Sequence, residues 1–213
     1  ITNVTAVTMT PGTEVLFGVN IGITDGKIEF ISKKVPEKMP KTIIEGTGMV
    51  AMPGLINCHT HLATSVLRCF TDDLTNKEAL EALLQKEAKM DSRSAKAAAL
   101  LSIAECLRFG VTSVSDLYYY PNATAQAVAE SGIKANLALS SYRYIDQNEE
   151  FDFETDEQCR ELQKVVDKWH GYDNGRIKID AGIFAEYTPL GISGGLRQRE
   201  GAGHAAASER NPE

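Results

Sequence analysis

The sequence predicts an α/β protein with a parallel sheet, preceded by a small β unit. After Gly54, apolar β-rich runs alternate with segments of helical periodicity, a pattern typical of strands joined by helical crossovers. Before residue 50, only short strand-like runs and turn signals occur. We expect four strands after Gly54, the first three each followed by a helical crossover, which favours a parallel sheet.

The first 50 residues predict short, mostly antiparallel strands. Asp25-Gly26 is a strong two-residue hairpin signal. Lys27–Ile31 after it alternates polar and apolar residues, as a half-buried return strand does. The other expected strands are Val15–Phe17, Val19–Ile23 and Thr42–Ile44, with a charged loop at Lys33–Lys41 before the last of them.

The spacing of apolar residues after Gly54 predicts the helices. In Ser92–Phe109 they recur on one helix face, and Gly110 suits the C-terminal stop. Thr155–Gln158 forms a capping box that opens a later helix, whose apolar stripe we interpret as core. The remaining expected elements are strands Val111–Leu117, Ile133–Leu139 and Ile177–Phe184, helix Asn122–Ser131 and loop Gly171–Gly175.

Composition excludes some classes of partner. The net charge of −7 and the pI near 5.2 argue against nucleic acid and anionic membranes. No apolar run approaches the ~18 residues of a membrane span, and no secretory signal opens the sequence. The four cysteines show no paired spacing, which favours reduced thiols in the cytoplasm over a disulfide framework.

Two histidines end the apolar run that follows Met52-Pro53-Gly54. Strand side chains alternate between faces, so Asn57, His59 and His61 share one side. Two imidazoles at one strand end can bind one divalent ion through ring nitrogens at roughly 2.0–2.1 Å. The alternative is a histidine pair without a metal. We favour metal ligation, because both histidines end a strand directly after a Pro-Gly turn.

The run Pro53–His61, followed by Leu67-Arg68 and Asp72-Asp73-Leu74, resembles the amidohydrolase superfamily. It is most similar to the branch of methylthioadenosine/S-adenosylhomocysteine deaminases and related chlorohydrolases. The resemblance extends to about Thr188. It implies that His59 and His61 end the first strand of a (β/α)8 barrel and bind one divalent metal, zinc or else iron.

A closed barrel of this kind needs about 250 residues, and roughly 160 follow Pro53. The sequence therefore predicts the N-terminal half of a (β/α)8 metal-dependent hydrolase barrel, preceded by a small β-sandwich-like unit. The expected divisions are 1–50, a β unit completed in the family by distant C-terminal strands; 51–188, four β/α units; and 189–213, a tail outside the family pattern.

The resemblance also bears on Glu87 and Phe184, and the position of Asp116 at a strand end gives a third candidate. Glu87 matches a glutamate that binds ribose hydroxyls, although Ala79 stands where the family has a nearby aromatic; a solvated helix glutamate is the alternative. Phe184 stands where the family has a substrate-contacting histidine. Asp116, at the end of the second barrel strand, either orients a ligand histidine or serves as a turn or helix cap. No catalytic residue is identifiable.

The tail after Thr188 is rich in Gly, Ala, Arg and Glu and lacks the fifth strand. One interpretation is a disordered tail. The other is a frameshift, because residues 204–212, translated one nucleotide later, can spell Met-Gln-Leu-His-Leu-Ser-Glu-Thr-Gln. That string resembles the family's strand-five motif, which carries a third metal histidine and a proton-shuttling glutamate.

The resemblance implies hydrolytic deamination of an adenine-type nucleoside, in which a metal-activated water attacks the amine-bearing ring carbon. For this chain we expect an inactive fragment with a small-molecule site. Two alternatives stay open. One is a non-catalytic half-barrel that self-associates, as a homo-oligomer, through its open edge. The other is a different amidohydrolase, such as a guanine deaminase or a chlorohydrolase.

Overall fold

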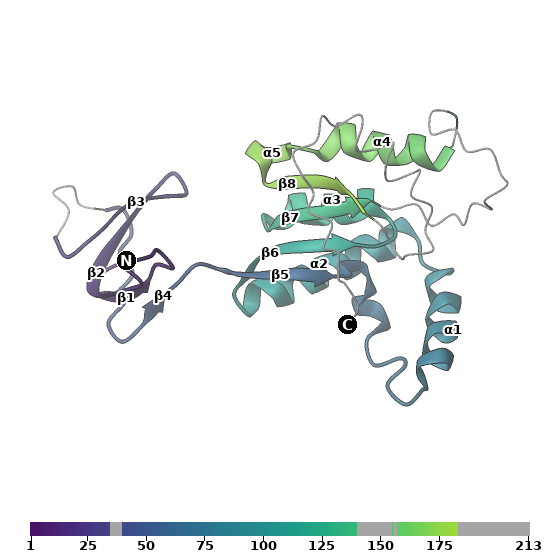
Figure 1. Ribbon diagram of the computed structural model, residues 1–213, viewed down its shortest axis with the longest axis horizontal. Helices are drawn as coiled ribbons and strands as arrows, with labels where there is room; N and C mark the ends of the chain where they lie inside the picture. Colours follow the sequence, from purple (N-terminus) through teal and green to yellow (C-terminus); the bar gives the residue numbers. More distant parts are fainter. Residues whose placement is uncertain (35–39, 140–154, 156, 183–213) are drawn as a thin grey trace. The chain divides into compact units, whose positions relative to one another are not determined.

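The computed structural model describes residues 1–34, 40–139, 155 and 157–182 (Figure 1). The chain forms two compact units, one from Ile1 to Gly54 and one from Leu55 onward. The predicted tail 189–213 and Phe184 lie outside the described residues, and the Thr155–Gln158 capping box lies partly outside them.

The first unit is one four-stranded sheet. Its order is β3-β2-β1-β4, antiparallel except for the parallel pair β1 and β4. The expected hairpin is confirmed, because Asp25 and Gly26 both have positive φ (49° and 74°) and join β2 to β3. The strands are β1 (Val4–Val7), β2 (Val15–Thr24), β3 (Lys27–Ser32) and β4 (Val50–Ala51).

The expected strand at Thr42–Ile44 is wrong. In the described residues this segment bonds with Thr2, just before β1, whose amide donates to the Ile44 carbonyl (2.9 Å), and a single bridge follows at Glu45. The side chains of Ile43 and Ile44 stay exposed. Their β-branched character predicted a strand, but the chain turns at Gly46–Met49 before a ladder can form. The short strand β1 was not predicted.

The second unit contains a four-stranded parallel sheet of order β5-β6-β7-β8, as the sequence predicted. Because the strands lie in sequence order, right-handed crossovers place α2 (Ser92–Arg108), α3 (Pro121–Ser131) and α4 (Glu157–Trp169) on one face (Figure 1). The elements are β5 (Leu55–Thr60), the 3₁₀ helix η1 (Leu62–Leu67), α1 (Asn76–Glu87), α2 (Ser92–Arg108), β6 (Val111–Leu117), α3 (Pro121–Ser131), β7 (Lys134–Leu139), α4 (Glu157–Trp169), α5 (Tyr172–Gly175) and β8 (Ile177–Ala181).

Local signals set the ends of the helices. Asp91 caps α2 with a reciprocal pair of bonds to Ser94, and Gly132 ends α3 in the left-handed conformation (φ 80°). The predicted loop Gly171–Gly175 contains the short turn α5, in which Asp173 and Asn174 are left-handed (φ 53° and 56°) rather than helical. Asn readily tolerates that conformation.

One core joins the sheet to α2, α3 and α4. The predicted stripe of α4 is buried in it, which confirms its interpretation as core. The buried members of this core that α4 contributes are Leu162, Val165, Val166 and Trp169, and they pack with Ile177 and Ile179 of β8 and Leu137 of β7. Among the described residues no helix is both long and apolar enough to span a bilayer.

Candidate functional site

The two candidate ligand histidines lie at the carboxyl end of β5, the first strand of the parallel sheet. His59 is the penultimate residue of the strand, and His61 follows its last residue. Their rings lie edge to face, with centroids 5.0 Å apart. The fold thus brings together the two imidazoles that the sequence singled out. A ring pair at this separation fits a divalent ion that uses one nitrogen from each.

A contact across the sheet fixes the tautomer of His61. Its Nδ1 lies 2.5 Å from the carbonyl oxygen of Leu117, the last residue of β6. A carbonyl oxygen only accepts, so Nδ1 carries the proton and donates. The lone pair then resides on Nε2, as ligation by a neutral imidazole requires. The backbone, and not a carboxylate, orients this histidine.

Asp116 lies beside the histidines, and its carboxylate bonds with a backbone amide. Its buried carboxylate accepts a hydrogen bond from the amide of Leu62, 2.6 Å away, at the start of η1. Burial raises the pKa of Asp116 to about 7, against the opposing effect of the Leu62 amide. Of the two predicted roles, the structure supports the cap, which fixes the backbone immediately after His61. The role in orienting a ligand histidine stays a prediction.

Glu87, the last residue of α1, lies near the same carboxyl end of the strands. The phenol of Tyr118, the residue after β6, donates a hydrogen bond to the carboxylate of Glu87. The ring of Tyr118 lies 5.4 Å from that of His61, centroid to centroid. His61, a predicted metal ligand, and Glu87, a predicted ribose ligand, therefore both contact Tyr118. Ala79 lies two turns earlier on α1.

The tyrosines at this carboxyl end of the strands are functional candidates that were not predicted from the sequence. Tyr118 is 7% exposed, and its ring contacts that of Tyr119 at 4.8 Å. The phenol of Tyr120 donates to the carbonyl of Met90 in the connection from α1 to α2 (2.5 Å). The signal was available, because three consecutive tyrosines follow a predicted strand at the functional end of such a sheet.

A third ligand is not found in the part of the chain that the structure describes. No group of three or more His, Cys, Asp or Glu side chains there is arranged to hold a metal. His170 follows α4, where its Nδ1 bonds with the backbone of Ile179 in β8. His170 is an exposed residue, away from the histidine pair of β5.

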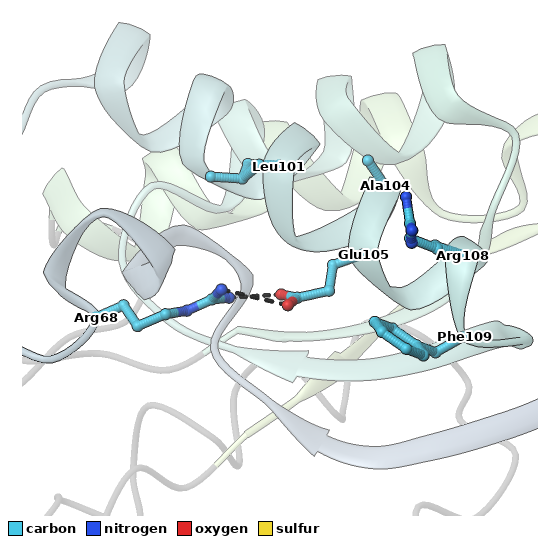
Figure 2. Close-up of a pocket in the computed structure, with 6 residues that line it drawn as sticks. All are labelled: Arg68, Leu101, Ala104, Glu105, Arg108 and Phe109. Atoms are coloured by element: carbon cyan, nitrogen blue, oxygen red, sulfur yellow. Dashed lines mark hydrogen bonds and ion pairs between the residues drawn. The ribbon is translucent and has the colours of Figure 1, made fainter.

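An open groove lies on the outer side of α2 (Figure 2). Arg68, which follows η1, forms a two-pronged ion pair with Glu105 across it, at 2.5 and 3.2 Å. Neither histidine lines this groove, nor does Glu87. The groove is therefore separate from the candidate site. Its lining residues are Arg68, Leu101, Ala104, Glu105, Arg108 and Phe109.

Two curated proteins with similar sequences are named as deaminases of adenosine derivatives. The chain is 35% identical over 176 residues to a 5-methylthioadenosine/S-adenosylhomocysteine deaminase of Dictyoglomus turgidum, a match that covers 82% of this chain and 40% of the relative. It is 36% identical over 189 residues to a 5'-deoxyadenosine deaminase of Methanosarcina mazei, covering 88% and 42%. The chain thus spans less than half the length of these relatives.

Solved structures share the fold. An atrazine chlorohydrolase from Arthrobacter aurescens TC1, complexed with zinc, superposes with a TM-score of 0.77 at 21% identity, over 94% of this chain and 50% of that one. A guanine deaminase from C. acetobutylicum gives 0.72 at 15% identity, over 92% and 49%. The amidohydrolase family model matches residues 50–189, which include the histidine pair, Glu87 and the whole parallel sheet. The chain belongs to the amidohydrolase family.

Proposed function

We propose that this chain supplies the metal-binding half of a hydrolytic deaminase that acts on an adenine-type nucleoside. The observation that carries the proposal is the histidine pair at the end of β5. Its rings lie 5.0 Å apart, and the Leu117 carbonyl holds one of them in the tautomer that leaves Nε2 free of a proton. The deaminases at 35% and 36% identity support the reaction class.

In this proposal His59 and His61 hold one divalent ion, zinc in preference to iron. When bound, such an ion acts as a Lewis acid that lowers the pKa of water. Asp116 fixes the turn after His61 through the Leu62 amide. Glu87 accepts hydrogen bonds from the ribose hydroxyls. Phe184, which lies outside the described residues, replaces a substrate-contacting histidine, and a phenyl ring neither titrates nor hydrogen-bonds.

We infer that the 213-residue chain does not deaminate nucleosides by itself. A catalytic zinc site normally has three protein ligands and a water, and within the described residues only two ligands converge. Ligands and proton-transfer groups act as a unit, so the absence of one member lowers turnover by orders of magnitude.

A chimera tests this proposal. Residues after Thr188 are replaced by the part of the D. turgidum relative that follows its matched region, and ammonia release from 5'-methylthioadenosine and adenosine is measured with added zinc. We expect turnover by the chimera and none by the 213-residue chain. His59→Ala and His61→Ala should abolish turnover, whereas His170→Ala serves as the histidine control.

Phe184→His in the chimera should raise turnover further. Turnover by the unmodified chain would contradict the inference that it is inactive. Turnover of guanine or of a chlorinated triazine in place of adenine nucleosides would favour one of the alternative amidohydrolase activities.

A second candidate, self-association, has one observation in its favour. Within the described residues, β5 pairs with β6 on one side only, and Leu55 and Ile56 on it are 50% and 68% exposed. An unpaired apolar edge strand favours pairing with another chain. Sedimentation velocity decides between a monomer and an oligomer. We propose a reducing compartment such as the cytoplasm, because the four cysteines show no paired spacing.

A further inference from the structure

We propose that Tyr118 is a positioning residue that holds the Glu87 carboxylate at a fixed place beside His61, and thereby supports recognition of the ribose diol. The inference rests on the proposed function, since it assigns the ribose hydroxyls to Glu87. It adds a residue that the sequence pattern did not single out.

The first support is the geometry of two contacts that converge on Tyr118. Tyr118 follows β6, its phenol donates to the carboxylate of Glu87, and its ring lies 5.4 Å from that of His61. Glu87 ends α1, and His61 follows β5. Tyr118 is thus the side chain that connects the two ends of the candidate site.

The second support is burial. Tyr118 is 7% exposed and belongs to a small apolar cluster with Ala63, Ala95 and Ala123. A ring packed in this way has little freedom to move, so its hydroxyl is fixed in space. A hydrogen bond to a charged carboxylate is stronger than one between neutral groups. The fixed hydroxyl therefore determines where the carboxylate lies.

The third support is the acceptor capacity of Glu87. An ionised carboxylate has two oxygens and about four acceptor positions. The phenol uses one position, on Oε1, which leaves capacity for both hydroxyls of a vicinal diol. A carboxylate held in this way is preorganised, and preorganisation lowers the entropy lost on binding.

Tyr120 separates this role from simple anchoring of the loop. Its phenol donates to the backbone carbonyl of Met90, three residues after Glu87. This contact anchors the same connection without touching a side chain that can bind a ligand. Tyr120→Phe is therefore a matched control for Tyr118→Phe: each removes one phenolic hydroxyl, but only the second acts on Glu87.

The first experiment is a pair of double-mutant cycles on the 213-residue chain, measured as the unfolding equilibrium constant. Glu87→Gln should raise the unfolding equilibrium constant about tenfold in the wild-type background and in Tyr120→Phe. It should change the constant little in Tyr118→Phe, where the partner is already gone. Equal effects of Glu87→Gln in all three backgrounds would overturn the inference.

The second experiment measures binding of adenosine and of 2',3'-dideoxyadenosine, which lacks both hydroxyls of the diol, by ligand-observed NMR. We expect the wild-type chain and Tyr120→Phe to prefer adenosine about tenfold, and Tyr118→Phe and Glu87→Gln to lose this preference. Equal weakening of both ligands by Tyr118→Phe would indicate a structural role only and overturn the inference. A third outcome is that the double-mutant cycle shows coupling between Tyr118 and Glu87 but the wild-type chain binds both ligands equally. This would contradict the ribose role of Glu87 in the proposed function and, with it, the role of Tyr118 in ribose recognition.

Discussion

The two units of the chain differ in how much of their apolar surface they bury by themselves. Among the described residues, the first unit buries a small hydrophobic cluster of Val4, Ala6, Val19 and Ile21. The described part of the second unit buries a core of seventeen residues between the sheet, η1, α2, α3 and α4. In the first unit, large apolar side chains such as Phe17 (69%), Ile23 (57%) and Ile28 (63%) stay exposed.

This difference has a physical origin. A single sheet has two faces, and without a second layer only a few side chains can be enclosed between strands. The parallel sheet has helices on one face, so alternate residues of β6, β7 and β8 are buried, whereas β5 stays largely exposed. The first unit is therefore expected to be the less stable of the two. The comparison also suggests that its exposed apolar residues suit a further β layer.

The aromatic residues allow the units to be followed separately. The single tryptophan, Trp169, and all seven tyrosines follow Leu55. Trp169 is 6% exposed, donates to Asn122 and packs on Tyr172. Its fluorescence reports on the second unit alone, whereas amide hydrogen exchange in β1 and β2 reports on the first.

The largest expected effect comes from the core of the second unit. Ile179→Ala removes a fully buried side chain from β8 and should lower the free energy of unfolding by about 3–4 kcal/mol. Urea denaturation followed by Trp169 fluorescence measures it. Val19→Ala in the first unit is the control and should leave the urea midpoint of the Trp169 fluorescence transition unchanged. Equal shifts from both would show that the units unfold together.

The next effect is the pH dependence caused by Asp116. Its pKa rises from 3.8 to about 7 on folding, so between those values the folded form binds more protons than the unfolded form. Stability therefore falls as pH rises from about 4 to about 7, by at most about 1.4 kcal/mol per pH unit.

Asp116→Asn should remove this contribution, since its amide oxygen can still accept from Leu62 but does not ionise. We expect the stability of the variant, relative to wild type, to increase with pH across that window. Trp169 denaturation curves at several pH values measure this. A constant difference between the two proteins would contradict the raised pKa.

Metal binding should belong to the second unit alone. The wild-type chain should bind zinc weakly, because two ligands converge, and His59→Ala or His61→Ala should weaken binding by roughly tenfold or more. Competition with a chromogenic chelator measures the affinity, and His170→Ala is the control. Tight stoichiometric zinc in the wild-type chain would reveal a further ligand. Equal weakening by all three variants would argue against a site at β5.

The smallest expected effects come from two matched glycines. Gly26 (φ 74°) turns the hairpin of the first unit, and Gly132 (φ 80°) ends α3 in the second; in each case a Cβ would meet open space. Alanine at either position should cost about 1 kcal/mol, from backbone conformation alone. Only Gly132→Ala should lower the urea midpoint of the transition followed by Trp169 fluorescence. A similar decrease with Gly26→Ala would again indicate coupling between the units.

The sequence by itself determined the features that depend on neighbours in the chain. The hairpin at Asp25-Gly26, the helix of Ser92–Arg108 and the parallel order of the strands each follow from local turn chemistry or apolar periodicity. The histidine pair is local too, because strand alternation alone puts His59 and His61 on one side.

The tertiary structure decided the features that depend on distant residues. Thr42–Ile44 has the composition of a strand, yet it finds only one bridge to the sheet. Asp116 became a buried cap because Leu62 lies 54 positions away in the sequence and 2.6 Å away in space. Tyr118 met Glu87 across 31 positions. The packing of the whole unit determines such partners. A buried polar group without a hydrogen bond is costly, so it bonds with the donor or acceptor that the fold places beside it.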